Sequence, residues 1–198
     1  MNALPLPLPA GVPQFAQNRR RRLVGWLLAR RGWHIEGGLP DIARLVLVAA
    51  PHSSWWDGVI GLAFKVALGV DIAFMGKREL FRGPLGWLLR KLGGIPVTRG
   101  QAQGVVEQMA ARFADSPRLW LGLAPEGTRR PVKAWRTGFW HVARAAGVPI
   151  LPVAFDYPAR RIVIGQSFLP AASPATDLAR LRDFYAPFRG LRRGVSGL

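Results

Sequence analysis

The sequence predicts a single-domain α/β fold with a mixed, largely parallel central sheet flanked by helices. Segments with the pattern of strands alternate along the chain with segments that have the pattern of helices, as in layered α/β proteins. One strand segment, 45–50, is almost entirely apolar, which is typical of a central strand covered on both faces. The chain has 198 residues, of which 49% are hydrophobic, so it can bury one substantial core.

Individual elements follow from apolar periodicity and from the turn residues between them. We expect strands at 33–37, 45–50, 71–75, 95–98, 118–123, 148–155 and 160–165. We expect helices at 19–32, 58–68, 84–92, 105–114, 138–145 and 176–184. Pro51 should end the second strand, because proline cannot donate to a sheet ladder. Thr137 should cap the fifth helix with its hydroxyl, and Gly147 should end it in a left-handed conformation.

Charge and composition divide the chain into four segments. Residues 1–18 are expected to be a flexible leader, residues 33–189 the folded domain, and residues 190–198 a flexible basic tail. Residues 19–32 place arginines on both sides of a short apolar stretch with tryptophan, which favours a basic amphipathic helix at a membrane interface. A surface helix that covers the core with its leucines fits the same pattern, so both interpretations are open.

Composition also limits the classes of partner and cofactor. The 28 basic residues against 11 acidic residues give a net charge of +17, which favours a nucleic acid, an acidic protein or an anionic bilayer as partner. The sequence has no run of 18 apolar residues, so we expect no membrane-spanning helix. It has no cysteine, and its three histidines lack clustered carboxylates, so we expect no metal site.

A histidine and an aspartate follow the apolar strand, in the segment 51–57, PHSSWWD. If Asp57 lies in the first helical turn after the strand, its carboxylate can accept from one ring nitrogen of His52, and the other nitrogen can face a substrate hydroxyl. Histidine is the natural general base near neutral pH. The spacing is short and common, so a helix-start carboxylate and a capped loop histidine are the alternatives.

A second polar segment, 125–129 or PEGTR, follows another strand, at the edge where open α/β sheets place their ligands. Arg129 can hold a phosphate by two parallel hydrogen bonds, and Gly127 lets the backbone approach a ligand closely. The turn through Thr128 offers backbone amides to an anion, and Glu126 would organise the loop or bind an acceptor hydroxyl. Together the two segments indicate a site that deprotonates a hydroxyl on a phosphate-bearing molecule.

In this order and at about this distance, the two segments resemble the H-x-x-x-x-D and F-P-E-G-T-R motifs of the glycerolipid acyltransferases, the 1-acyl-glycerol-3-phosphate acyltransferases and their relatives. Two further blocks are similar, one reading GKRELF and GGIPVTR at 76–81 and 93–99, the other VPILPV at 148–153. The resemblance covers about residues 33–165. Pro51, Ala124 and Arg130 stand where the family usually has Asn, Phe and Ser, and these departures leave the acceptor open.

The resemblance implies a set of roles for these residues. His52 and Asp57 would be catalytic, and the acceptor and its phosphate would be bound by Glu126, Gly127, Thr128, Arg129, Arg99 and Lys77. A solvated basic face is the alternative for Arg99 and Lys77. Residues 33–189 would be the acyltransferase domain.

The resemblance also implies an activity. An acyl group would pass from acyl-CoA or acyl-carrier protein to a hydroxyl of a lysophospholipid or glycerol phosphate, first of all 1-acyl-sn-glycerol-3-phosphate, in phospholipid synthesis. No cofactor is implied beyond the acyl thioester, which is a cosubstrate. The expected place is the cytoplasmic face of the cell membrane, as a peripheral or monotopic protein on an anionic surface.

Three other functions remain open from the sequence. The net charge would suit a nucleic-acid-binding module, but the tryptophans sit mostly in apolar stretches and no nucleic-acid-binding motif is present, so we expect no nucleic-acid partner. An acyltransferase that acts on another lysolipid, or a catalytically silent lipid-binding relative, would carry the same motifs.

Overall fold

The structure is a computed structural model that describes residues 8–15, 19–97 and 102–197. Its strands are β1 (His34–Glu36), β2 (Arg44–Ala50), β3 (Ile72–Lys77), β4 (Gly94–Val97), β5 (Leu119–Leu123), β6 (Ile150–Asp156) and β7 (Arg161–Ile164). Its helices are α1 (Arg19–Arg30), α2 (Trp55–Leu68), η1 (Arg78–Phe81, a 3₁₀ turn), α3 (Gly83–Lys91), α4 (Ala102–Asp115), α5 (Gly138–Ala146) and α6 (Pro174–Tyr185). The predicted strands and helices are confirmed, with shifts of a few residues at their ends.

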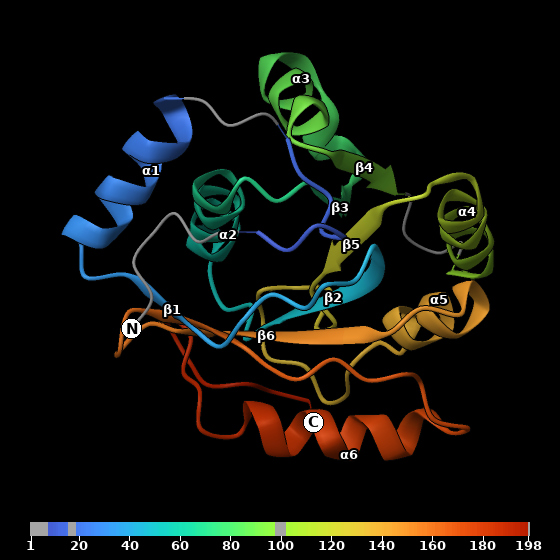
Figure 1. The fold of residues 1–198 in the computed structure, drawn as a ribbon. Coiled ribbons are helices and arrows are strands. Elements are labelled where there is room, and N and C mark those ends of the chain that lie inside the picture. The colour runs from blue at the N-terminus through green and yellow to red at the C-terminus, as the bar shows by residue number, and fades with distance from the viewer. Residues whose placement is uncertain (1–7, 16–18, 98–101, 198) are drawn as a thin grey trace.

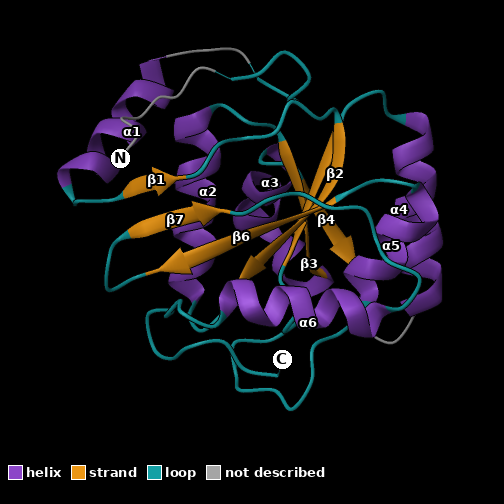
Figure 2. Ribbon diagram, turned by 60° about the horizontal axis from the view of Figure 1, so that its bottom comes forward, coloured by secondary structure: helices purple, strands orange, loops and turns teal. Residues whose placement is uncertain are grey.

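Within the described residues the strands form one seven-stranded sheet in the order β1-β7-β6-β2-β5-β3-β4. The five strands from β6 to β4 run parallel, β7 runs antiparallel to β6, and β1 is parallel to β7. The helices α1 and α2 cover one face, and α4, α5 and α6 cover the other (Figures 1 and 2). The predicted mixed, largely parallel sheet flanked by helices is therefore confirmed.

The apolar strand β2 lies in the middle of the sheet and buries both of its faces. Leu45 and Leu47 pack in the core beneath α1 and α2, whereas Val46, Val48 and Ala50 pack in the core with α4, α5 and α6. Successive side chains of a strand point to opposite faces, so an uninterrupted apolar run satisfies both cores at once. The strand ends at Ala50, immediately before the proline predicted to end it.

Two helix starts differ from the prediction. The helix α2 begins at Trp55 and not at residue 58, because Ser54 caps it: the Ser54 hydroxyl accepts from the amide of Trp56. Thr137 does precede α5, but its hydroxyl makes no capping hydrogen bond, and its carbonyl instead accepts from Trp140. Gly147 ends α5 in the left-handed conformation, with φ of 63°, as predicted.

Residues 8–15 are the described part of the segment predicted as a flexible leader, and they are packed against the domain. Val12 is fully buried in the core beneath α1 and α2, and Gln14 forms a β-bridge with Val70. The amide of Asp71 donates to the carbonyl of Pro13 at 2.7 Å. This part of the prediction is corrected, since an apolar side chain and backbone hydrogen bonds hold residues 8–15 on the domain. Residues 1–7 and 16–18 lie outside the described part.

Candidate active site

Three adjacent parallel strands bring the candidate residues to one edge of the sheet. Val48 of β2 pairs with Leu123 of β5, and Ala50 of β2 pairs with Ala154 of β6. The segments that follow these strands therefore leave the sheet side by side at its carboxyl edge. This is the edge where open parallel sheets bind ligands. The segment 51–57 follows β2, the segment 124–137 follows β5, and the turn to β7 follows β6.

His52 and Asp57 come together as predicted. Asp57 lies in the first turn of α2, and its Oδ2 is 3.4 Å from Nδ1 of His52. The His52 side chain is 28% exposed, whereas that of Asp57 is 1% exposed. The contact is long for a hydrogen bond, as is common for catalytic pairs before substrate binds. With Nδ1 directed at the carboxylate, Nε2 is the ring nitrogen available to a substrate.

Asp57 is also the helix-start carboxylate that was the alternative interpretation. Its Oδ2 accepts from the amides of Ser53 at 2.6 Å and Ser54 at 2.7 Å, and its Oδ1 accepts from the hydroxyl of Tyr157 at 2.7 Å. Burial raises the pKa of Asp57, but the hydrogen bonds from His52, Tyr157 and the two amides outweigh it and lower the pKa below its usual value. The aspartate is therefore held ionised beside the histidine.

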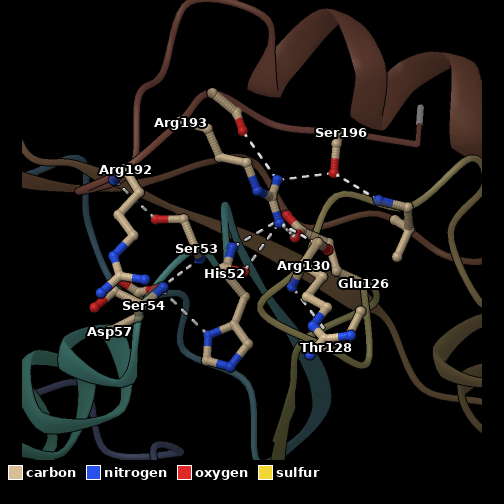
Figure 3. A network of polar contacts seen from close by, with 12 residues as sticks. His52, Ser53, Ser54, Asp57, Glu126, Thr128, Arg130, Arg192, Arg193 and Ser196 are labelled. Atoms are coloured by element: carbon tan, nitrogen blue, oxygen red, sulfur yellow. Dashed lines mark hydrogen bonds and ion pairs between the residues drawn. The ribbon is translucent and has the colours of Figure 1, made fainter.

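Glu126 joins the two motif segments. Its Oε1 accepts from the backbone amide of His52 at 3.1 Å, and its Oε2 accepts from Arg193 at 2.5 Å (Figure 3). The side chain is fully buried, and burial raises the pKa of Glu126 above its usual value although Arg193 and the His52 amide oppose the rise. Glu126 thus organises the loop, which is one of the two roles considered for it.

The rest of the PEGTR segment forms a tight turn beside Glu126. Gly127 has a positive φ of 62°, and a Cβ there would lie 3.1 Å from Cδ of Arg136, so glycine suits both the backbone and the contact. The Thr128 hydroxyl accepts from the amide of Arg130 at 3.3 Å. Arg129 is exposed on this loop. Its position suits an anion ligand, and its binding to phosphate stays a prediction.

Of the other two predicted phosphate ligands, Lys77 and Arg99, the structure describes Lys77 alone. Lys77 ends β3 at the same sheet edge, but its exposed ammonium pairs with Glu79 at 3.4 Å. Arg99 lies outside the described residues. No group of three or more histidines, aspartates and glutamates in the described part of the chain is placed to hold a metal ion.

Sequence reasoning missed Tyr157 and Arg193. Tyr157 is 100 residues from Asp57 and follows β6, so its only signal was a polar aromatic residue at the carboxyl end of a buried strand. Arg193 is 67 residues from Glu126, in the segment predicted as a flexible basic tail. That prediction is corrected for residues 190–197, which are hydrogen-bonded to the site; Leu198 lies outside the described residues. No local pattern distinguished Arg193 from the arginines around it.

The chain was compared with known protein families, curated proteins and solved structures. The family model described as Acyltransferase matches residues 34–156, well over half of the chain. The chain belongs to the acyltransferase family. The matched region contains His52, Asp57 and Glu126, and it ends one residue before Tyr157.

Curated relatives of this chain carry the name 1-acyl-sn-glycerol-3-phosphate acyltransferase. The protein from Streptococcus pneumoniae is 28% identical over 127 residues, 64% of this chain and 47% of its own length. The Escherichia coli protein is 35% identical over 95 residues, covering 44% and 38%, and the Haemophilus influenzae protein is 29% identical over 144 residues, covering 67% and 58%. The chain thus matches about half of the length of these relatives.

A solved structure shares the fold. The 1-acyl-sn-glycerophosphate acyltransferase from Thermotoga maritima superposes with a TM-score of 0.59 at 18% identity, over 83% of this chain and 74% of that one. The similarity extends beyond the segment that the family model matches, and it supports the α/β architecture of the chain.

Proposed function

We propose that the chain is an O-acyltransferase that moves a fatty acyl group from an acyl thioester to a hydroxyl of a lysophospholipid or glycerol phosphate. The observation that carries the proposal is the arrangement at the carboxyl edge of the sheet. There the His52–Asp57 pair and the PEGTR loop stand side by side, joined by the hydrogen bond from the His52 amide to Glu126. The names of the relatives favour 1-acyl-sn-glycerol-3-phosphate as acceptor and phospholipid synthesis as the role.

Proton transfer by His52 starts the proposed reaction. Its Nε2 removes the proton from the acceptor hydroxyl while Asp57 holds Nδ1 and stabilises the imidazolium that forms. The oxygen attacks the thioester carbonyl carbon and forms a tetrahedral intermediate. Collapse of the intermediate breaks the carbon–sulfur bond, and the imidazolium returns its proton to the departing thiolate. The products are the acyl ester and the free thiol of CoA or acyl-carrier protein.

The oxyanion of the intermediate needs donors other than the amides of His52, Ser53 and Ser54. The amide of His52 donates to Glu126, and the amides of Ser53 and Ser54 donate to Asp57. All three are therefore engaged inside the protein and unavailable to the substrate. The turn supplies the base and its orientation, and the charge of the intermediate has to be met by other groups of the site.

Binding of the acceptor phosphate is supported by the arginines around the loop after β5. Arg129, Arg130 and Arg136 are exposed there, and guanidinium groups can bind phosphate through paired hydrogen bonds. A phosphate bound at this loop would place a nearby hydroxyl of the same molecule within the region of His52. The excess of basic residues over the whole chain suits an acidic carrier protein as donor and also an anionic membrane surface.

Residues on α1 support a peripheral or monotopic place on the cytoplasmic face of the membrane. Leu28 is buried against the core, whereas Leu23, Trp26 and Leu27 are 57%, 55% and 37% exposed, so the helix covers the core and also offers apolar side chains to an interface. The guanidinium of Arg30 lies over the Trp26 ring at 5.5 Å. Exposed apolar and aromatic side chains among cations are typical of interfacial helices. None of the helices in the described part is long and apolar enough to cross a membrane.

The helix α3 adds a second exposed apolar group on the same part of the molecule. Leu85, Trp87 and Leu88 are 55%, 59% and 46% exposed, and Lys91 lies over the Trp87 ring at 4.1 Å. In Figure 1, α1 and α3 both lie beyond α2, away from α6. Two such helices on one side of the domain would present apolar surface to a bilayer over a wider area than α1 alone.

A product assay tests the function. Purified protein is incubated with acyl-CoA or acyl-carrier protein as donor and with glycerol 3-phosphate, lysophosphatidic acid and other lysolipids as acceptors, and products are identified by mass. We expect an acyl ester to form with a phosphate-bearing acceptor, together with stoichiometric free thiol. Thioester hydrolysis without an ester product, or no reaction with any pair, would reject the proposal.

Liposome co-sedimentation tests the membrane surface. Trp26→Ser should reduce binding to vesicles that contain anionic phospholipid, because it removes an exposed aromatic group from α1. Leu169→Ser, which changes a leucine that is 68% exposed outside these helices, is the matched control. Equal binding of the two variants would contradict the assignment of this surface.

A further inference from the structure

The segment 190–197, here called the C-terminal strap, is fastened at one end to the turn that carries His52. The amide of Arg192 donates to the Ser53 hydroxyl at 3.3 Å. A Cβ on Gly190 would lie 2.6 Å from that hydroxyl oxygen and 3.0 Å from Cγ of Pro51. The strap therefore touches the turn after β2 so closely that only glycine fits at its first residue.

The other end of the C-terminal strap is fastened to the segment after β5. The Trp135 amide donates to the carbonyl of Gly197, and the Trp135 indole donates to the carbonyl of Ser196, both at 2.8 Å. The amide of Val132 donates to the Ser196 hydroxyl at 3.2 Å. The strap thus links the two motif segments, which are far apart in the sequence.

Arg193 lies in the middle of the strap and holds both segments through one guanidinium (Figure 3). Its Nη2 donates to Oε2 of Glu126 at 2.5 Å, to the carbonyl of Arg130 at 3.1 Å and to the carbonyl of His52 at 3.3 Å. Its Nη1 donates to the Ser196 hydroxyl at 2.8 Å, which keeps the group in place from its own side. The rigid fork of an arginine can bridge these acceptors, and a lysine ammonium can reach fewer of them.

The ion pair also has an electrostatic consequence. Glu126 is fully buried, so desolvation favours its neutral form and raises its pKa, and the hydrogen bond from Arg193 is the strongest opposing influence. The ionised carboxylate accepts from the His52 amide through Oε1, whereas a protonated carboxyl could present a donor instead. Loss of Arg193 would therefore loosen the link between Glu126 and the turn that carries the base.

We infer that Arg193 is a positioning residue for acyl transfer: its guanidinium holds the Glu126 carboxylate and the carbonyls of His52 and Arg130, and so fixes the His52 turn against the PEGTR loop. This inference rests on the proposed function, since it assigns a further residue to the same site. It goes beyond the family match, which ends at residue 156, because the group comes from the last residues of the chain.

Kinetics of variants of the 198-residue chain provide the first test. Arg193→Gln should lower kcat by about tenfold or more, because it leaves a buried carboxylate without its charged partner. Arg193→Lys should recover part of the loss, since it restores the charge without the fork. Arg182→Gln changes an exposed arginine of α6 and serves as the charge-matched control. Each variant is checked for folding by its thermal melt.

Action through Glu126 is tested by the pH profile and by a double variant. In Arg193→Gln the acidic limb of kcat/KM should move to higher pH, because Glu126 would accept a proton more readily. In a protein that already carries Glu126→Gln, adding Arg193→Gln should neither move the acidic limb of kcat/KM nor lower kcat further. A merely structural role of Arg193 would lower kcat or stability without this dependence on Glu126.

A titration that needs no activity separates this inference from the proposed function. The chain has four glutamates, so carbon-13 NMR of labelled carboxyl groups can follow Glu126 individually. The pKa of Glu126 should be higher in Arg193→Gln than in Arg182→Gln. If the natural chain forms no acyl ester, the proposed function fails while the titration still tests the ion pair. If Arg193→Gln changes neither kcat nor the titration of Glu126, the inference is overturned. A gain in activity would also overturn it, because the strap would then inhibit the reaction.

Discussion

The two buried carboxylates of the site, Asp57 after β2 and Glu126 after β5, are held in opposite ways. Asp57 receives two of its hydrogen bonds from amides three and four residues away, and its pKa is lowered. Glu126 receives its hydrogen bonds from His52 and Arg193, which are 74 and 67 residues away, and its pKa is raised by burial. Asp57 is therefore ordered mainly by its own turn, and Glu126 is ordered by residues that are distant in the sequence.

The difference shows how the two halves of the site depend on the rest of the fold. The capping box that orders Asp57 forms as soon as α2 forms, because Ser54 and Asp57 belong to the same first turn. The position of Glu126 requires the sheet to assemble and the C-terminal strap to close. We therefore expect changes near Asp57 to act mainly on the chemistry, and changes near Glu126 to act on the alignment of the two loops.

The largest effect is expected for His52→Ala, which removes the base that both carboxylates serve. The turnover number should fall by about 10²–10⁴-fold, the usual contribution of general-base catalysis, with little change in the thermal melt. His141→Ala, which removes an exposed histidine of α5, is the control. Normal turnover of His52→Ala would show that His52 is not the general base, and Asp57 and Glu126 could then not be compared as residues that support it.

A smaller but still large effect is expected for Asp57→Asn. The amide keeps the size of the side chain but no longer holds the imidazole in one tautomer, so kcat should fall on the order of 10²-fold or more. It also weakens the cap of α2, which should lower the free energy of unfolding by about 1 kcal/mol. Steady-state kinetics and urea denaturation measure the two effects.

Asp177→Asn is the matched control for Asp57. Asp177 is also buried in the first turn of a helix, α6, and accepts from the indole of Trp140 at 2.9 Å and from the amide of Ala171 at 2.7 Å. Its variant should lose stability and retain kcat. A drop in kcat of equal size in both variants would mean that Asp57 acts through stability alone.

The smallest effect is expected for Tyr157→Phe, which removes the one long-range hydrogen bond of Asp57. One such bond contributes about 0.5–1.5 kcal/mol, so kcat should fall by about two- to tenfold. The lowered pKa of Asp57 means that its contribution to stability is present above the unfolded-state pKa and is lost as pH falls through the folded-state pKa. Without Tyr157 that folded-state pKa rises, so the acid loss of stability should begin at higher pH.

Tyr185→Phe is the control for this pH effect. The Tyr185 hydroxyl is buried, donates to the carbonyl of Val48 at 2.6 Å and accepts from the amide of Val153 at 3.2 Å, so its removal costs two hydrogen bonds, but no carboxylate is involved. Thermal melts from about pH 3 to pH 7 should show a shifted acid transition for Tyr157→Phe and a uniform loss for Tyr185→Phe. Identical profiles would show that Tyr157 does not influence Asp57.

Much of the fold could be predicted because its signals are local. The apolar run of β2, Pro51 after it and Gly147 after α5 each determine a boundary through backbone chemistry that neighbouring residues set. The predicted start of α2 at residue 58 is three residues too late, because the residue types of the segment 51–57 also suit a turn. Its Ser54 cap belongs to the same segment, so that boundary was also present in the sequence.

The sequence by itself determined the His52–Asp57 pair and the glycine turn of the PEGTR loop, because each is defined by residue type and short spacing. Only the tertiary structure decided that Tyr157 reaches Asp57 and that Arg193 reaches Glu126. The physical reason is that the partner of a buried carboxylate is selected by proximity in the folded chain. A parallel sheet brings distant loops to one edge, and no local pattern in a chain rich in arginine marks the arginine that will lie there.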